Sequence, residues 1–254
     1  MPALFIGHGS PMNALERNRY TDAWRALAVA IPRPAAVLSI SAHWYIHETA
    51  VTGMAAPRTI HDFGGFPPEL YAVQYAAAGA PRIAPRVQDL LAPRAIRIDA
   101  DWGLDHGTWS VLTHLYPDAD VPVLQLSIDA SQSPRACYEI GQSLQPLRDA
   151  GVLIFGSGNV VHNLRAINWN HAAAPLPWAQ QFEDELSSRL QNGDFGSLAN
   201  YNALGAAARR SVPTPEHYLP LLYVLGTAYK DETCSIPIKG IELGSISMLC
   251  ALVS

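Results

Sequence analysis

The sequence has few cysteines, and it has neither a long apolar run nor a basic leader. Its 254 residues include three cysteines, and Cys137, Cys234 and Cys250 are odd in number and scattered, which argues against a disulfide framework. Apolar runs such as Met248–Val253 are far shorter than the roughly 20 residues of a membrane span. The segment Met1–Ser10 lacks the basic and apolar regions of a secretory signal. We therefore expect a cytoplasmic protein with no membrane partner.

Charge is also scarce, and no cluster of basic residues is present. Seventeen Lys and Arg residues against 22 Asp and Glu residues give a net charge of −5. Without a basic cluster the chain cannot neutralise a run of phosphates, which excludes a nucleic-acid partner. Charged residues make up 15% of the chain and hydrophobic residues 49%, so a large core can form and disorder is excluded.

Short apolar runs alternate with helical patterns along the whole chain. The runs are apolar at consecutive positions, which is typical of parallel strands buried on both faces. Each leads into a small or polar turn. The four predicted strands are Ala3–Gly7, Ala36–Ser41, Val121–Ser127 and Val152–Gly156.

Helical patterns follow these runs. Predicted helices cover Thr21–Ile31, Pro81–Leu91, Pro134–Leu147, Trp178–Asn192 and a stretch from about Glu216 to Ala228. The last of these has a helix-start signal, Thr214-Pro215-Glu216. The terminal run Ile246–Leu252 is predicted to be a late or edge strand. The alternation predicts a single α/β domain over residues 1–254, with a mostly parallel central sheet flanked by helices on both faces.

Histidines lie where several predicted strands end. His8 directly follows the first strand, His43 comes two residues after the second, and Asn159 and His162 follow the fourth. Ligands of open parallel sheets bind outside the carboxyl ends of the strands, so these side chains can converge on one edge. His217, in the predicted first turn of a late helix, could point into the same crevice. The pattern fits a site for metal or proton chemistry, and it also fits ordinary loop histidines, because no HExxH, CxxC or Gly-x-Ser-x-Gly motif is present.

Six segments, taken together, resemble the class III extradiol ring-cleaving dioxygenases of the DOPA-dioxygenase-like branch. They occur in order and extend over most of the chain. They are Gly7–Met12 (GHGSPM), Ser41–Trp44 (SAHW), His61–Pro67 (HDFGGFP), Gly103–Trp109 (GLDHGTW), Gly156–Asn163 (GSGNVVHN) and Pro215–Pro220 (PEHYLP).

The resemblance implies one divalent metal ion per chain, Zn²⁺ or Fe²⁺, held by His8, His43 and His217. It implies that His162 lies near the open metal positions, as an acid/base or as an additional ligand. It also places His106 in the substrate pocket, among the catalytic residues. The implied substrates are O₂ and a small aromatic diol, such as DOPA or a related catechol. Zinc is the ion that purification is expected to find, and ferrous iron is the ion that ring opening needs.

Other residues in these segments are candidates for the substrate pocket. His61 and Asp62 belong to a Gly- and Pro-rich loop that could cover it, and Trp44 could form part of an aromatic wall with Trp102 and Trp109. Asp105 precedes His106 and is expected to orient its ring. The remaining histidines, expected to be structural or exposed, are His47, His114 and His171.

Two other function classes remain open from the sequence. One is a non-catalytic metal-binding protein of the same fold, against which the set His8, His43, His217 and His162 argues, since a binder needs no acid/base group. The other is a zinc hydrolase, because a histidine-rich zinc site can activate water. The motifs report the reaction centre, so the particular catechol and the oligomeric state are open as well.

Overall fold

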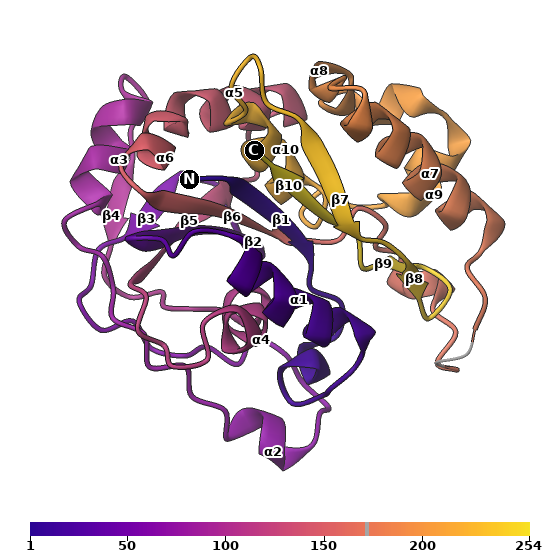
Figure 1. Cartoon of the computed structure of the whole chain (residues 1–254), viewed down its shortest axis with the longest axis horizontal. Helices are drawn as coiled ribbons and strands as arrows, with labels where there is room; N and C mark the ends of the chain where they lie inside the picture. The colour runs from indigo at the N-terminus through magenta and orange to yellow at the C-terminus, as the bar shows by residue number, and fades with distance from the viewer. Residues whose placement is uncertain (171–172) are drawn as a thin grey trace.

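The computed structural model describes residues 1–170 and 173–254. Its centre is an eight-stranded sheet with the strand order β4-β3-β5-β2-β6-β1-β10-β7 (Figure 1). A separate two-stranded ribbon, β8–β9, lies beyond β7. The strands are β1 Ala3–Gly7, β2 Ala36–Ile46, β3 Ala50–Thr52, β4 Arg97–Asp99, β5 Val123–Asp129, β6 Val152–Gly158, β7 Cys234–Ile238, β8 Ile241–Glu242, β9 Ile246–Ser247 and β10 Cys250–Val253.

The middle of the sheet is parallel. Strands β5, β2, β6 and β1 pair in parallel, whereas β3 runs antiparallel to β5, and β10 pairs antiparallel with both β1 and β7. Every residue of β1, β5 and β6 is buried, as expected of strands covered on both faces. The prediction of a single-domain α/β fold with a mostly parallel sheet is confirmed.

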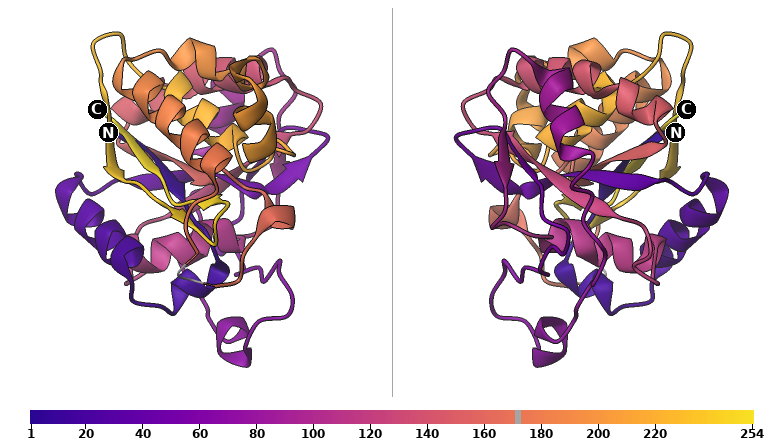
Figure 2. Two further views of the ribbon diagram at one scale, coloured as in Figure 1. Left: turned by 90° about the vertical axis from the view of Figure 1, so that its right-hand side faces the viewer. Right: turned by 90° about the vertical axis from the view of Figure 1, so that its left-hand side faces the viewer.

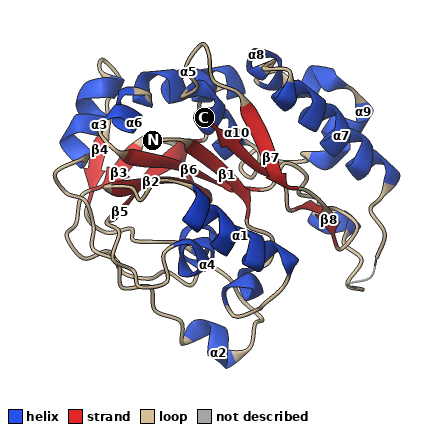
Figure 3. Cartoon of the chain, in the orientation of Figure 1, coloured by secondary structure: helices blue, strands red, loops and turns tan. Residues whose placement is uncertain are grey.

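Helices cover both faces of the sheet (Figures 2 and 3). One layer packs on the core that contains Leu38, Ile154 and Leu222, and the other on the core that contains Trp24, Leu112 and Phe155. The first layer comprises α3 Ala84–Leu91, α5 Pro134–Leu144, α6 Pro146–Asp149, α7 Pro177–Gln191, α8 Phe195–Leu198, α9 Ala206–Ser211 and α10 Leu219–Gly226. The second comprises α1 Arg19–Ala30, α2 Pro68–Tyr71 and α4 His106–Leu115. Within the described residues no helix is both long and apolar enough to span a bilayer.

Several predicted elements differ from the structure. The helix predicted over Pro134–Leu147 is divided into α5 and α6, and the strand predicted over Ala36–Ser41 continues to Ile46, so His43 lies within β2 rather than after the strand. The helix expected from about Glu216 begins at Leu219, because the His217 carbonyl accepts a hydrogen bond from the Asn159 N–H (2.9 Å) and so does not serve a helix. The run Ile246–Leu252 is split into β9 and β10, and β10 is an interior strand because β7 pairs along its outer side.

Candidate active site

Neighbouring strands bring the strand-end histidines together. The register pairs Gly7 of β1 with Gly158 of β6, and Ser41 of β2 with Ser157 of β6, so β1 and β6 end level with Ser41, while β2 continues to Ile46. His8 follows β1, His43 lies near the end of β2, and Asn159 and His162 follow β6. The crevice predicted at this edge of the sheet is therefore present.

His217 joins this group from a different part of the chain. Gly158 allows its backbone to approach, because a Cβ atom at Gly158 would lie 2.1 Å from the His217 carbonyl oxygen. The adjacent Asn159 then donates its backbone N–H to the same oxygen. A glycine at this position is thus required for the turn that delivers His217.

The imidazoles of His8, His43 and His217 form a tight triangle. Their ring centroids lie 5.1 Å (His8–His43), 5.4 Å (His8–His217) and 5.1 Å (His43–His217) apart. One nitrogen from each ring lies within 4.8 Å of the other two, and Nε2 of His8 is 3.3 Å from Nε2 of His43. The structure therefore brings together the three residues predicted as metal ligands.

A hydrogen-bond chain fixes the tautomer of His8. Ser157 Oγ donates its one proton to the Gly107 carbonyl oxygen (2.5 Å) and lies 2.9 Å from Nδ1 of His8. Because that proton is already committed, we assign the proton of the second hydrogen bond to Nδ1 of His8. This leaves Nε2 of His8 with a lone pair that faces His43.

Carboxylate groups fix the tautomers of the His43 and His217 rings. An Asp62 oxygen lies 3.2 Å from Nδ1 of His43, and a Glu216 oxygen lies 3.3 Å from Nδ1 of His217. A carboxylate beside Nδ1 favours the tautomer with the proton on that nitrogen, which leaves Nε2 as the ligand atom.

This arrangement fits a bound cation. Two Nε2 lone pairs that face each other at 3.3 Å repel unless a positive charge lies between them. Two imidazole nitrogens bound tetrahedrally at roughly 2.0–2.1 Å from one ion lie about 3.4 Å apart. Burial, followed by the neighbouring imidazoles, holds the pKa of His8 and of His217 well below its usual value and lowers the pKa of His43 to about 3. The three rings are therefore neutral near pH 7, as metal ligands must be.

His162 lies beside the triangle rather than in it. Its ring stacks on that of His217, with centroids 3.5 Å apart and planes inclined by 10°, and its backbone N–H donates to the Ser211 carbonyl oxygen. The set of mutually close nitrogens that contains His8 and His43 does not include it. Burial lowers the pKa of His162 to about 4, so the ring is neutral at pH 7 and can accept a proton.

His106 and Asp62 form a second layer behind His43. The His106 ring lies 3.8 Å from that of His43, centroid to centroid, and Asp62 accepts hydrogen bonds from both the backbone N–H and Nδ1 of His106 (2.9 Å each). Burial alone would raise the pKa of Asp62, but the hydrogen bond from His106 and the nearby imidazoles lower it to about 2. Asp62 is therefore ionised and holds both rings from one side.

The prediction that Asp105 orients His106 is wrong. Asp105 is the N-cap of α4, where it accepts the Thr108 N–H (3.1 Å), and its other oxygen accepts from Gln125 Nε2 (2.7 Å). One oxygen thus caps α4 and the other is held by Gln125 of β5, and Asp62 orients the His106 ring instead.

A cavity of about 310 Å³ opens in front of the histidines. His8, His43, His106, His162 and His217 all line it. Its other walls are mainly apolar and come from three loops: Phe63 and Phe66, then Leu164, Ile167 and Trp169, then Leu243 and Ile246 of the β8–β9 region. The sequence did not indicate Leu164, Ile167, Trp169 or Leu243, because they lie in segments without a helical or strand period, and it placed Ile246 in a predicted strand without connecting it to the site.

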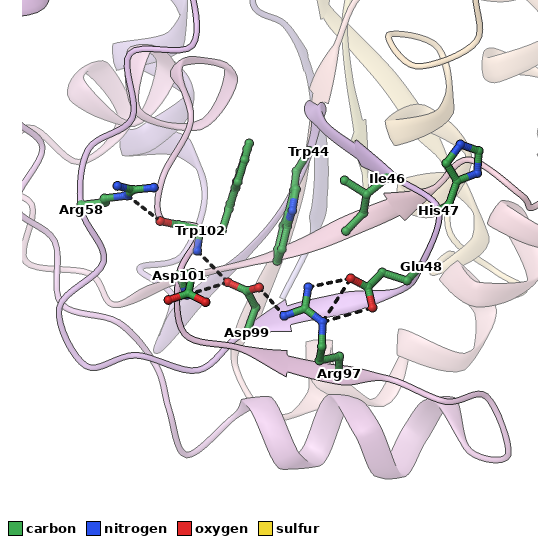
Figure 4. A pocket seen from close by; sticks show the side chains of 9 residues that line it. All are labelled: Trp44, Ile46, His47, Glu48, Arg58, Arg97, Asp99, Asp101 and Trp102. Atoms are coloured by element: carbon green, nitrogen blue, oxygen red, sulfur yellow. Dashed lines mark hydrogen bonds and ion pairs between the residues drawn. The ribbon is translucent and has the colours of Figure 1, made fainter.

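A second cavity, of about 490 Å³, lies where β2 and β4 end (Figure 4). Trp44 and Trp102 stack there, with centroids 5.4 Å apart and planes inclined by 6°. Arg97 pairs with Glu48 (2.7 Å) and with Asp99 (2.5 Å), so the ionic groups satisfy one another. Among the described residues, no group of three potential metal ligands lies in this cavity. Trp44 therefore faces a different space from the one predicted.

Among the described residues, the remaining predicted ones do not line the cavity in front of the histidines. His61 is not among the described residues that line either cavity. Its Nε2 lies 3.0 Å from the Val73 carbonyl oxygen, and its ring packs against Phe63. Trp109 is buried and donates to the Ile60 carbonyl oxygen. As predicted, His114 is buried and structural and His47 is exposed, whereas His171 lies outside the described residues.

The position of Asp62 gives a testable expectation. Asp62→Asn should weaken divalent metal binding about 10- to 100-fold, the usual effect of removing the carboxylate behind a histidine ligand. Competition with a chelator measures the affinity directly. Asp101→Asn is the matched control, because Asp101 is exposed at the second cavity. An unchanged affinity in Asp62→Asn would show that Asp62 does not support the site.

Comparisons with known proteins agree on one family. Residues 2–243 match the model of the catalytic LigB subunit of aromatic ring-opening dioxygenase. The chain is 50% identical to 4,5-DOPA dioxygenase extradiol of Escherichia coli (strain K12), covering 98% of this chain and 93% of that protein, and 37% identical to 4,5-DOPA dioxygenase extradiol of Beta vulgaris, covering 91% and 88%. A crystal structure of an uncharacterized protein from Escherichia coli K12 superposes with a TM-score of 0.88 at 44% identity, covering all of both chains.

Proposed function

This chain belongs to the family of the catalytic LigB subunit of aromatic ring-opening dioxygenase and is an extradiol ring-cleaving enzyme. On that premise, we propose that it opens a catechol at a metal ion held by His8, His43 and His217. The family implies an aromatic substrate and O₂. The catechol, the ligand set and the identity of the metal are our proposal. It favours ring opening over the zinc hydrolase and the non-catalytic metal-binding protein that the sequence left open.

The observation that carries the proposal is the pair of facing Nε2 atoms in a buried triangle of neutral imidazoles. Three protein ligands would leave a bound metal ion able to take further groups. A ferrous ion held by His8, His43 and His217 would supply redox chemistry toward O₂, which zinc lacks. We therefore propose Fe²⁺ as the working metal, with Zn²⁺ as the ion that purification finds.

We assign proton transfer to His162. A catechol loses a proton when it binds, and the oxygen–oxygen bond of the reacting dioxygen needs an acid when it breaks. A neutral histidine beside the site can accept the first proton and return it later. His162 lines the cavity and has its ring beside His217.

His106 and Asp62 position the diol and the His43 ligand. Because Nδ1 of His106 donates to Asp62, its Nε2 is left as an acceptor for a catechol O–H. The apolar side chains of Phe63 and Phe66 can pack on the ring faces. We leave Trp44 and His61 out of the proposal, since neither is among the described residues that line this cavity. Asp62 is not among them either, so it acts on the diol through His106 and His43.

The whole chain, residues 1–254, acts as one catalytic domain in this proposal. The proposed ligands lie at positions 8 and 217, so segments near both ends of the chain build one site. A separated half would lack at least one ligand.

Oxygen uptake tests the proposal. Metal-free protein is loaded anaerobically with Fe²⁺, and then 4-methylcatechol and air are added. We expect about one O₂ consumed per catechol and a yellow ring-opened product, whereas the Zn²⁺-loaded protein should consume none. If Fe²⁺-loaded protein consumed no O₂ with any catechol, while Zn²⁺-loaded protein hydrolysed esters or amides, the hydrolase would replace the dioxygenase.

A further inference from the structure

Buried polar side chains form a patch on the face of the sheet that α4 covers (Figure 3). Gln125 of β5 is paired in register with Ser39 of β2, and Ser41 of β2 is paired with Ser157 of β6. All four side chains are fully buried. A buried polar group costs free energy unless it is hydrogen-bonded, so this polar patch is expected to serve definite partners.

Two of these side chains bind the first turn of α4. Ser39 Oγ lies 2.7 Å from Thr108 Oγ1, and Ser157 Oγ donates to the Gly107 carbonyl oxygen (2.5 Å). His106 lies in the same turn. The bonds of its neighbours therefore tie His106 to two strands of the sheet.

Gln125 binds this turn at two points. Its Oε1 accepts the Asp105 backbone N–H (2.9 Å), and its Nε2 donates to Asp105 Oδ2 (2.7 Å). The other oxygen of Asp105 accepts the Thr108 N–H (3.1 Å). A backbone N–H can only donate, which fixes the orientation of the Gln125 amide. The pair thus holds both the backbone and the side chain of the residue that directly precedes His106.

The turn is packed closely against β2, next to a proposed ligand. A Cβ atom at Gly107 would lie 2.5 Å from Ser41 Oγ and 2.9 Å from Cδ2 of His43. Asp62 fixes the rotation of the His106 ring, but the distance of this ring from His43 depends on where the α4 backbone lies. A displaced turn would therefore move His106 relative to the proposed metal ligands without changing its tautomer.

We infer that Gln125 and Asp105 are positioning residues of ring opening, which set the place of His106 through the first turn of α4. The inference rests on the proposed function, in which His106 accepts a catechol O–H. Neither Gln125 nor Asp105 is among the described residues that line the cavity, so they act on the diol through His106.

Asp105→Asn breaks the pair without changing its size. Because the Thr108 N–H holds one oxygen, the new amide group would face Nε2 of Gln125, donor against donor. If the Gln125 amide turned over to accept this bond, its nitrogen would face the backbone N–H of position 105 instead. One bond is lost in either orientation. We therefore expect Zn²⁺-loaded protein without O₂ to bind 4-methylcatechol about tenfold more weakly in a calorimetric titration, the effect of about one hydrogen bond to the displaced His106.

The exchanged pair, Asp105→Asn with Gln125→Glu, should restore the bonds. The carboxylate at position 125 accepts from both the backbone N–H and the new amide, and the net charge of the pair is unchanged. Catechol affinity should return to within about twofold of that of the unaltered protein. Asp99→Asn is the matched control, because Asp99 is also a buried carboxylate that accepts two backbone N–H bonds, and it lies at the second cavity. This control should bind catechol normally even if its melting temperature falls.

A double-mutant cycle shows whether the pair acts through His106. In a His106→Phe background, Asp105→Asn should weaken catechol binding no further, since the bond that it disturbs is already absent. A purely structural role would give the same loss in both backgrounds. Should Asp105→Asn not fold, Gln125→Met, which has a side chain of similar length and no amide, takes its place in the cycle.

These measurements separate failure of the inference from failure of the proposed function. If Fe²⁺-loaded protein opens no catechol, the proposed function falls, and the affinities measured with Zn²⁺ still decide the inference. If catechols are opened but Asp105→Asn binds them normally, the inference is wrong and the proposed function stands. The same holds if the exchanged pair stays weak, or if the losses add in the His106→Phe background.

Discussion

His43→Ala should leave the protein folded but without its metal, and ring opening should fall below detection. His43 provides one of three proposed ligands and lies 3.3 Å from His8 through the two Nε2 atoms. Two imidazoles cannot complete a site that needs three protein ligands, so the metal content should fall from about one ion per chain to nearly none. Elemental analysis after dialysis measures this, and circular dichroism checks the fold.

His47→Ala is the matched control for this experiment. His47 is exposed, lies four residues further along the chain and faces the second cavity, so its loss should change neither metal content nor activity. His8→Ala should behave like His43→Ala. If His43→Ala or His8→Ala kept its full metal content, the ligand assignment would be wrong.

The parts of the fold that the sequence predicted are those with a local pattern. Strands β1, β2, β5 and β6 are buried on both faces for most of their length, so they read as continuous apolar runs. Helix α7 is amphipathic and reads as a helix. Helix α4 is buried at almost every position and has no polar stripe, and β4 has three residues, so neither gave a recognisable period.

In the candidate site, too, some features were predicted from the sequence and others were not. The convergence of His8, His43 and His162 was predicted from their places at the ends of predicted parallel strands, although His43 lies within β2. The partners of these rings did not follow, because they come from distant segments: Ser157 is 149 residues from His8, and Asp62 is 44 residues from His106. The Asp62 contact depends on how its loop packs, and a loop has no period from which its packing can be read. The Ser157 contact depends on which strand lies beside β1, and here that strand is β6. Asp105 was predicted to orient His106 because the two are adjacent in sequence, but its carboxylate caps helix α4 through the Thr108 N–H.

His162 provides the second large effect. His162→Gln should retain the metal and still bind catechol, yet turnover should fall by about 10²- to 10⁴-fold, the usual contribution of a general acid–base group. The reason is geometric: His8, His43 and His217 form one close group of nitrogens, whereas His162, stacked on His217, belongs to a different group with Glu216 and His217. Its loss should therefore remove a proton acceptor while three ligands remain.

The stacking on His217 requires a second variant. Removal of the His162 ring also removes a packing surface from a proposed ligand, so a loss of activity in His162→Gln alone could reflect a displaced His217. His162→Phe keeps an aromatic ring at that position and has no nitrogen to accept a proton. It should show the same metal content as the unaltered protein and the same fall in turnover as His162→Gln.

The two variants together separate three roles of His162. Retained metal with slow turnover in both indicates proton transfer, because only the titrating nitrogen is missing from His162→Phe. Loss of metal in both would make His162 a fourth ligand, and four protein ligands would crowd the positions that a chelating diol and O₂ require. Slow turnover in His162→Gln with normal turnover in His162→Phe would limit the residue to supporting the ring of His217. Normal turnover in both would remove it from the mechanism. We expect the first result, because the ring lines the cavity and stacks beside a proposed ligand, where it can take the proton that a binding catechol releases.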